Sequence, residues 1–307
     1  MILDMRTSLT ACAVVLGLVS AACGGSSTGD AGRVQVVASF YPLAEVAQRV
    51  GGDHVQVDNL SPVGAEPHDL ELRASQVALV KDAKVVFVLG KGFQPAIEKA
   101  AASNHGTVRM LERLPIEQRG DVAPEGSASN RASIDPHVWL DPTLMARIVA
   151  EVRTALASAD PRDASQFAAN AERFDAELVA LDGRYKSGLA HCTRTTIVTG
   201  HQAFGRLAAR YGLTQKGIGG LTPDAEPSPD RVAELTDLVR SDGITTVFTE
   251  TLVSPKIAQT LAREAGVRTE VLDPLEGLTK EEIAAHATFV SVMDANLLKL
   301  RSALGCQ

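Results

Sequence analysis

The chain has 307 residues, of which 22% are charged and 45% are hydrophobic. This balance excludes a disordered or collagen-like chain, and the length predicts about two domains of roughly 150 residues each. The formal net charge of −7 argues against a nucleic-acid-binding protein, which usually has a basic surface, and it favours a cationic ligand only weakly. Because aromatic residues make up only 4% of the chain, we expect no surface built for stacking bases or sugars.

The N-terminus has the pattern of a bacterial lipoprotein signal. An apolar run over residues 9–22 is shorter than the roughly 20 residues of a membrane span but suits a signal-peptide core. Cys23 follows two alanines and precedes a Gly/Ser-rich stretch, as in lipoproteins whose first mature residue is a lipidated cysteine. We therefore predict a signal peptide over 1–22, a lipidated flexible tether over 23–32, and an extracytoplasmic protein anchored to the cell membrane. A buried N-terminal helix is the alternative.

Strands and helices alternate in the first half of the chain. The predicted strands cover 33–39, 54–60, 84–89 and 107–111, and the predicted helices cover 42–50, 73–82 and 95–103. The continuous apolar run over 84–89 is typical of a buried parallel strand. This alternation predicts an N-terminal α/β lobe with a parallel sheet, which we place at 33–160. Residues 115–136 are polar and rich in Gly, Pro and Ser, so we interpret them as a surface loop.

A long helix is predicted between the two halves of the chain. After a helix over 142–158, residues 161–190 carry a sustained apolar stripe at helical spacing, formed by Phe167, Phe174, Leu178, Leu181, Tyr185 and Leu189. At 1.5 Å per residue this segment would span about 45 Å, enough to link two lobes as a rigid spine. Gly183 and Gly188 weaken the prediction for its last turns.

The second half repeats the alternation and predicts a C-terminal α/β lobe at 191–307. The predicted strands cover 195–199, 214–218, 244–249 and 269–272, and the predicted helices cover 203–211, 229–241, 255–265 and 279–304. Gly266 stands just past the end of one helix, and Ser228 is available to cap another. Thr279 and Glu282 have the spacing of a capping box at the start of one long closing helix over 279–304.

The cysteines divide by position. Cys12 leaves with the predicted signal peptide and Cys23 carries lipid, so Cys192 and Cys306 remain. In an oxidising compartment these two are expected to form a disulfide that fastens the C-terminal tail to the start of a second-half strand. The chain-entropy model gives such a long loop roughly 4–5 kcal/mol of stabilisation. Two unpaired thiols are the alternative.

Three of the seven histidines occur where strands or loops lead into helices. His68 lies in a loop between a strand and a helix, His137 directly precedes a helix, and His201 follows a strand, as does Asp273. Ligands of open α/β sheets bind outside the carboxyl ends of strands, so these side chains are candidate ligands for a divalent transition metal, zinc first. Residues so far apart carry no local signature, and spacing alone leaves the metal site unproven. The other four are interpreted as solvated or locally bonded: His54, His105, His191 and His286.

The sequence resembles the zinc/manganese-type solute-binding proteins of bacterial ABC importers, the TroA-like superfamily. The resemblance covers residues 33–304 and is strongest in DPHVWLDP at 135–142 and HQAFGRLAARYGL at 201–213. It implies two α/β lobes with parallel sheets, joined by one long rigid helix, with a metal site in the cleft between them. In that family the matching positions coordinate the metal: His68, His137, His201 and Asp273.

Two further carboxylates and the kind of metal follow from the resemblance. Glu250 matches a recurrent glutamate near the cleft and is expected to orient a ligand, whereas Glu66 is interpreted as an outer partner of the site or as solvated. Three imidazoles favour zinc, because manganese prefers more oxygen ligands and manganese-type relatives tend to have Glu where His201 stands. We expect zinc affinity to fall steeply below about pH 6, near the ordinary histidine pKa.

The resemblance implies a monomer that is not an enzyme. It would capture zinc and deliver it to an ABC permease whose ATPase lies on the cytoplasmic side, with no nucleic-acid partner. The long helix would restrict closure to small movements. Residues 115–136 contain no histidine, so loop-assisted metal capture has no support.

Four other functions remain open at this point. A manganese-binding importer component differs from the favoured interpretation only in its metal. A zinc hydrolase would need a general base and an open metal position, and the chain has no HExxH or GxSxG motif. A chelate-binding protein would need aromatic and arginine-lined pockets, and an adhesive lipoprotein would need no metal transport at all.

Overall fold

The computed structural model describes residue 1 and residues 32–116, 134–223 and 227–307. The predicted signal peptide, Cys23 and nearly all of the predicted tether lie outside the described residues, as does most of the predicted loop at 115–136. The chain divides into Met1–Gly32 and Arg33–Gln307, and the second unit is described below. None of its described helices combines the length and the apolar character that crossing a membrane would require.

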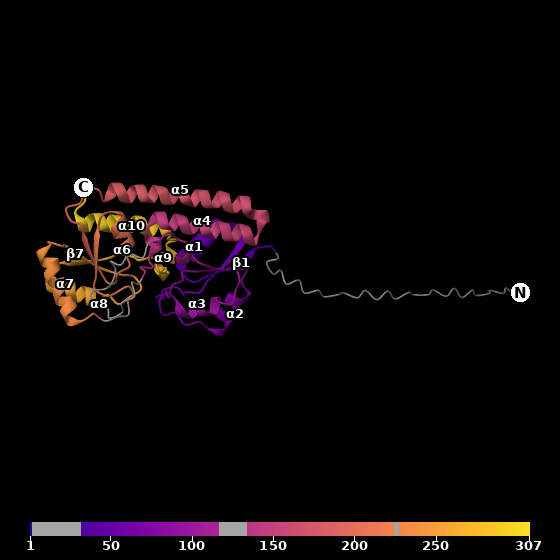
Figure 1. Cartoon of the computed structure of the whole chain (residues 1–307), viewed down its shortest axis with the longest axis horizontal. Coiled ribbons are helices and arrows are strands. Elements are labelled where there is room, and N and C mark those ends of the chain that lie inside the picture. The colour runs from indigo at the N-terminus through magenta and orange to yellow at the C-terminus, as the bar shows by residue number, and fades with distance from the viewer. Residues whose placement is uncertain (2–31, 117–133, 224–226) are drawn as a thin grey trace. The chain divides into compact units, whose positions relative to one another are not determined.

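The described residues of this unit form two sheets, one in each lobe (Figure 1). Each sheet has four parallel strands, and both sheets have the same strand order. The first sheet has the order β2-β1-β3-β4, with strands β1 (Val34–Ala38), β2 (Val55–Asn59), β3 (Val85–Val88) and β4 (Thr107–Arg109). The second has the order β6-β5-β7-β8, with strands β5 (Thr196–Thr199), β6 (Thr214–Gly217), β7 (Thr246–Thr249) and β8 (Arg268–Val271). Every neighbouring pair is parallel, which confirms the predicted fold class.

Helices connect the strands of each lobe. Those of the first half are α1 (Tyr41–Gly51), α2 (Ala74–Asp82), α3 (Pro95–Ala101) and α4 (Pro142–Ala159). Those that follow the long helix are α6 (Gly205–Arg210), α7 (Pro229–Ser241), α8 (Lys256–Ala265), α9 (Lys280–Ala284) and α10 (Phe289–Leu304). Single 3-10 turns occur at Gly52–His54, Met110–Glu112, Val138–Leu140 and Pro161–Asp163.

Successive side chains of the central strands pack on opposite faces of their sheet. In β1, Val36 and Ala38 join the largest apolar cluster, whereas Val37 joins a smaller cluster under α2 and α3. In β5, Ile197 joins the largest cluster and Val198 joins a separate one under α7 and α8. The period of two places apolar residues on both faces, which explains why the central strands have continuous apolar runs.

The largest apolar cluster extends through both lobes. It includes Val36 from the first sheet, Phe248 from the second, Phe174 of the long helix and Leu300 of α10. The lobes therefore share one continuous interior, and a large rotation of one lobe against the other would break its packing.

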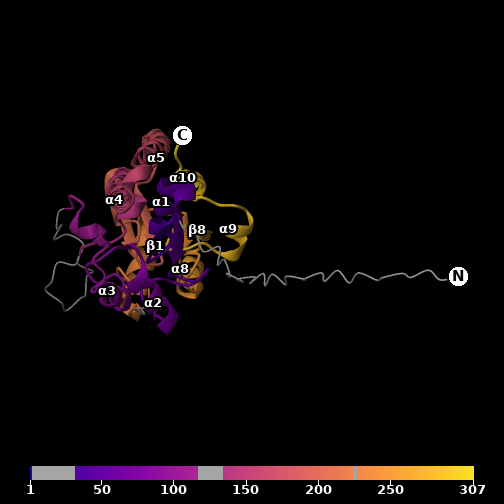
Figure 2. The same cartoon turned by 90° about the vertical axis from the view of Figure 1, so that its right-hand side faces the viewer.

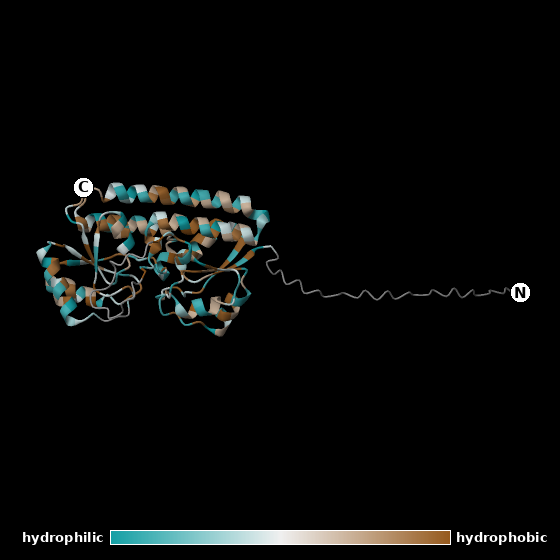
Figure 3. Ribbon diagram, viewed as in Figure 1, coloured by the Kyte–Doolittle hydropathy of each residue, from teal (hydrophilic) through white to brown (hydrophobic). Residues whose placement is uncertain are grey.

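The predicted linking helix is present as α5 (Ala164–Gly188), which follows the 3-10 turn that starts at Pro161. It packs against α1 and α4 of the first lobe and against α10 of the second, and it lies beside α4 in both views (Figures 1 and 2). The buried hydroxyl of Tyr185 donates a hydrogen bond to the Met293 carbonyl at 2.7 Å. Along α5, apolar and polar residues alternate in short segments, as expected of a helix with one buried face (Figure 3).

The closing segment differs from its prediction. Instead of one helix over 279–304, α9 ends at Ala284 and α10 begins at Phe289. His286 lies between them with a φ of 53°, a left-handed conformation that stops the helix, and the predicted position of His286 inside a helix is wrong. Thr288 then opens a new capping box with Ser291, while the predicted capping box of Thr279 and Glu282 is confirmed.

The predicted disulfide joins Cys192 and Cys306, which are 114 residues apart in sequence. Around it, the Arg194 amide donates to the Leu304 carbonyl at 3.0 Å and the Gln307 amide donates to the His191 carbonyl at 3.1 Å. The C-terminal end is thus fastened beside the entry to β5, as predicted.

Candidate metal centre

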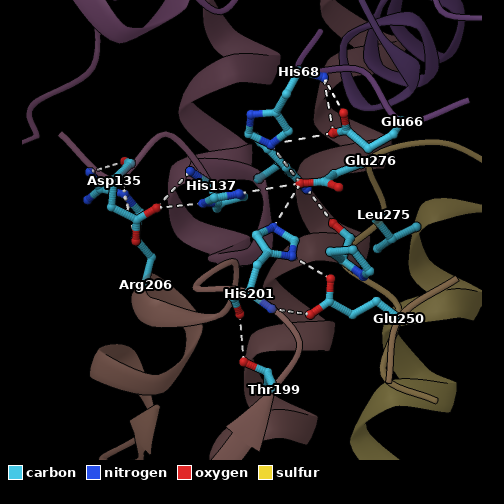
Figure 4. A network of polar contacts seen from close by, with 12 residues as sticks. Glu66, His68, Asp135, His137, Thr199, His201, Arg206, Glu250, Leu275 and Glu276 are labelled. Atoms are coloured by element: carbon cyan, nitrogen blue, oxygen red, sulfur yellow. Dashed lines mark hydrogen bonds and ion pairs between the residues drawn. The ribbon is translucent and has the colours of Figure 1, made fainter. Parts of the chain in front are cut away.

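Four buried side chains converge where segments of the two lobes meet (Figure 4). They are His68, His137, His201 and Glu276, and none is more than 4% exposed. One potential ligand atom from each lies within 4.8 Å of every other, and among the described residues they are the one such group. His68 and His137 come from the first half of the chain, and His201 and Glu276 from the second, so the group requires both lobes.

The three distances from Glu276 to the histidine nitrogens match the edges of a tetrahedral zinc site. Oε1 of Glu276 lies 3.2 Å from Nε2 of His68, 3.4 Å from Nε2 of His137 and 3.3 Å from Nε2 of His201. A tetrahedral zinc ion with bonds of about 2.0–2.1 Å holds neighbouring ligand atoms about 3.3 Å apart. Nε2 of His137, Nε2 of His201 and Oε2 of Glu276 have no hydrogen-bond partner among the described residues, although all three atoms are buried. Buried polar atoms without partners are costly, and a bound cation would satisfy them.

Adjacent strands of the second sheet position His201. It stands two residues after the end of β5, and Glu250 stands directly after the neighbouring strand β7. The Glu250 carboxylate accepts hydrogen bonds from the His201 amide, at 2.8 Å, and from its ring Nδ1. Gly200 permits this approach, because a Cβ there would lie 2.8 Å from Oε1 of Glu250. With Nδ1 donating, Nε2 is left free to bind a metal.

A carboxylate also orients His137. Oδ1 of Asp135 accepts from the His137 amide at 3.0 Å and from ring Nδ1 at 2.8 Å, so Nε2 again faces the cluster. The following residues form the 3-10 turn Val138–Leu140, and the next residue, Asp141, is the N-cap of α4. In that turn, Trp139 Nε1 donates to the Pro274 carbonyl at 2.7 Å, and this bond joins the His137 segment to the loop that carries Glu276.

His68 is held by its own loop and by an aromatic ring. Its amide donates to both carboxylate oxygens of Glu66, at 3.0 and 3.1 Å, and its imidazole packs edge-on against the Phe93 ring with centroids 4.4 Å apart. Oε1 of Glu66 lies 3.7 Å from Nε2 of His68, farther than Oε1 of Glu276. This places Glu66 beside the cluster and outside the four converging side chains.

The fourth side chain in the group is Glu276 and not the expected Asp273. Oδ1 of Asp273 accepts the amide hydrogen of Leu275 at 2.7 Å, so its carboxyl group turns back on its own loop. Asn296 of α10 fixes the same residue by bonding both its amide, at 3.0 Å, and its carbonyl, at 2.7 Å. Leu275 has a φ of 56°, and this left-handed residue redirects the chain so that Glu276 enters the cluster.

The sequence contains a partial signal for Glu276, since it lies only three residues beyond Asp273. Both carboxylates follow β8, and spacing does not choose between them. Which carboxylate enters the cluster depends on the left-handed turn at Leu275, and a leucine in the sequence does not predict such a turn.

The pKa values of Glu276 and Asp273 are shifted in opposite directions. Burial disfavours the charged form of Glu276, but the facing His201 and the close approach of all three imidazoles outweigh it and lower the pKa of Glu276 well below its usual range. Burial and the neighbouring Glu282 instead raise the pKa of Asp273 to about 8. These shifts favour the charged form of Glu276, which can bind a cation, and the protonated form of Asp273.

The surrounding carboxylates raise the pKa values of two of these histidines, His201 and His137. Burial opposes protonation of His201, but Glu250 and Glu276 raise its pKa well above the ordinary value. For His137, burial is likewise outweighed by the hydrogen bond to Asp135 and by the nearby Glu276 carboxylate, which raise its pKa. A metal that binds these nitrogens must displace protons.

A family model described as zinc-uptake complex component A, periplasmic (ZnuA), matches residues 36–303. The chain belongs to this family. Among curated ZnuA-like proteins, the zinc-binding lipoprotein AdcA of Streptococcus pneumoniae serotype 4 is 36% identical over 299 residues, which cover 94% of this chain and 59% of AdcA. The chain thus spans about three-fifths of the length of that relative. The high-affinity zinc uptake system protein ZnuA of Bacillus subtilis is 34% identical over 305 residues, which cover 94% of both proteins.

Solved structures of ZnuA-like proteins share the fold. The Zn(II)-bound ZnuA-like domain of Streptococcus pneumoniae AdcA superposes with a TM-score of 0.73 at 35% identity and covers 89% of this chain and 99% of that domain. The laminin-binding protein Lmb of Streptococcus agalactiae, described as a bifunctional protein with adhesin and metal transporting activity, gives a TM-score of 0.77 at 28% identity over 88% of this chain and 99% of Lmb.

Proposed function

We propose that the protein captures zinc outside the cytoplasm and passes it to an ABC permease powered by a cytoplasmic ATPase. The observation that carries this proposal is the buried group of three imidazoles and one carboxylate, whose nitrogen–oxygen distances match those of a tetrahedral zinc site. Membership of the zinc-uptake family and the Zn(II)-bound relatives support zinc as the cargo.

We propose that the four ligands are His68, His137, His201 and Glu276, with Glu250 and Asp135 as orienting partners. Three nitrogen donors with one oxygen donor suit zinc better than manganese, which prefers more oxygen ligands. Four protein ligands complete a tetrahedral site, whereas catalytic zinc keeps a position open for water, so the arrangement supports binding rather than hydrolysis.

The route to the membrane is also part of the proposal. The cysteine at position 23 would carry the lipid, and residues 24–32 would tether the globular unit near the permease. The relative AdcA is named a lipoprotein, which supports this assignment. The protein would act as a monomer and bind no nucleic acid.

The decisive experiment measures zinc affinity of the full chain by competition with a chelator, and compares Glu276→Gln with Asp273→Asn. We expect wild type to bind one zinc ion per chain. Glu276→Gln removes the anionic ligand and should weaken binding by more than the roughly 10- to 100-fold typical of losing an outer partner. Asp273→Asn keeps the acceptor for the Leu275 amide and should change affinity less than threefold.

The opposite pattern, with affinity lost in Asp273→Asn and kept in Glu276→Gln, would overturn the ligand assignment. A wild-type protein that binds manganese more tightly than zinc would overturn the choice of cargo.

A further inference from the structure

The short helix α6 of the second lobe contacts the segment that presents His137. Its first turn starts at Gly205, four residues after His201, and Arg206 points toward Asp135 (Figure 4). Nε and Nη2 of Arg206 both donate to the backbone carbonyl of Asp135, at 2.8 and 2.6 Å. Nε also lies 4.0 Å from Oδ2 of the same residue. Asp135 therefore connects Arg206 of one lobe to the imidazole of His137 in the other.

The backbone of α6 also packs closely against the Asp135 carboxylate. A Cβ at Gly205 would lie 2.9 Å from Oδ2 of Asp135, closer than real Cβ contacts come. The bare backbone at this position lets the carboxylate lie against α6 while its other oxygen, Oδ1, holds His137. Both the carbonyl and the carboxylate of Asp135 are thus set by the first turn of α6.

Residues other than Arg206 attach α6 to the rest of the protein. Arg210, one turn after Arg206, lies 2.7 Å from Oδ1 of Asp182 on α5 and 3.3 Å from Oδ1 of Asp141. Leu207 and Ala208 are buried in the largest apolar cluster. These contacts of Arg210, Leu207 and Ala208 hold the helix in place, and the paired hydrogen bonds of Arg206 fix the Asp135 peptide.

We propose that Arg206 is a positioning residue for zinc binding: from the second lobe it fixes Asp135, and through Asp135 it fixes the ring of His137. Because the paired donors come from a planar guanidinium, they restrain the direction of the carbonyl as well as its distance. The inference rests on the proposed function and adds to it a residue that touches none of the four ligands. It also makes the geometry of one ligand depend on the lobe that carries His201.

The test uses the full chain and compares Arg206→Met, Arg206→Lys and Gly205→Ala with wild type. Zinc affinity, measured by chelator competition, should fall about 10- to 100-fold in Arg206→Met, as for other lost outer partners. Arg206→Lys keeps a single donor and should recover part of that loss. Gly205→Ala should weaken zinc binding about tenfold by pushing Asp135 away, although alanine favours a helix more than glycine does.

Two substitutions of the same types serve as controls. Arg184 forms a two-point contact with Asp294, at 2.8 and 3.0 Å, that joins α5 to α10, and Arg184→Met removes a comparable arginine contact. A Cβ added at Gly183 would meet no described residue beyond the backbone of its own helix within 4 Å, so Gly183→Ala inserts the same methyl group into open space. Both controls should bind zinc within twofold of wild type.

A spectroscopic readout separates positioning from general loosening. The visible absorption of bound Co²⁺ reports the geometry of its ligands, so Arg206→Met and Gly205→Ala should shift or weaken these bands, while the controls keep the wild-type spectrum. Wild-type affinity and spectra in both site variants would overturn the inference, as would an equal loss of affinity in Arg184→Met. Failure of wild type to bind zinc would instead overturn the proposed function, and the inference with it.

Discussion

The two lobes hold their histidines in different ways. His201 stands two residues beyond a strand, and a buried carboxylate from the adjacent strand bonds both its amide and its ring. His68 stands nine residues beyond β2, bonds Glu66 only through its amide, and rests its ring on Phe93. Among the described residues no carboxylate bonds its Nδ1 atom. Strand ends therefore preorganise one ligand, while a loop and an aromatic contact place the other.

The largest expected effect is the pH dependence of zinc affinity, which follows from the carboxylates around His201. The raised pKa of His201 means that zinc must displace a proton even near neutral pH. Observed affinity should fall by about tenfold per pH unit for each displaced proton, and thus by about 100-fold or more between pH 7.5 and pH 5.5. This decline begins at a higher pH than an ordinary histidine would give. Chelator competition at three pH values measures it, and a flat profile would contradict a site of three histidines.

Replacing Glu250, which holds His201, should lower zinc affinity more than replacing Glu66, which lies beside His68. In Glu250→Gln the amide group faces the ring nitrogen and favours the tautomer whose Nε2 carries the proton, which cannot bind zinc. We expect affinity to fall about 10- to 100-fold. Glu66→Gln keeps an acceptor for the His68 amide and should cost less than threefold. Equal losses in the two variants would remove the distinction between the lobes.

Gly200→Ala tests the contact between Glu250 and His201 without replacing either residue. The new Cβ would meet Oε1 of Glu250 at 2.8 Å, so the carboxylate must move and zinc affinity should fall about tenfold. Gly183→Ala is the matched control and should stabilise the protein by about 0.5–1 kcal/mol through helix propensity, with unchanged zinc binding. Thermal unfolding and zinc titration of both variants measure the two quantities. Unaltered affinity in Gly200→Ala would show that Glu250 need not lie so close.

The smallest effect on zinc binding is expected from the disulfide. It lies only in the second lobe, so it offers a competing explanation for the firm hold on His201. The double variant Cys192→Ser/Cys306→Ser should lower the free energy of unfolding by about 2–5 kcal/mol. Zinc affinity should change less than threefold, because the contacts of His201 with Glu250 do not involve the disulfide. A larger loss of zinc affinity would show that the disulfide, and not only Glu250, holds His201 in position.

The features readable from sequence are those with local chemical causes. Ser228 accepts a hydrogen bond from the Arg231 amide and opens α7 at the predicted residue, and Gly266 ends α8 in a left-handed conformation. Three of the four converging side chains were expected, because each follows a strand or precedes a helix in a stretch that resembles a known family.

The misses share one cause. Leu275 and His286 adopt left-handed conformations, which are uncommon for residues other than glycine, and each redirects the chain at a point where pattern predicts something else. At Leu275 the result is Glu276 in the cluster instead of Asp273, and at His286 it is two helices instead of one. Leu275 is buried in the largest apolar cluster, so its turn depends on tertiary packing. His286 is exposed, and backbone hydrogen bonds close its turn, including one from the Ala287 amide to the Glu282 carbonyl at 2.9 Å.

The continuous interior has a consequence for dissecting the protein. Because one apolar cluster contains residues of both sheets, of α5 and of α10, cutting the chain between the lobes would leave each fragment with a face built to be covered by the other. We therefore expect neither lobe to fold on its own, and the pair to unfold in a single cooperative step. Substitutions in this shared cluster should lower the stability of both lobes together.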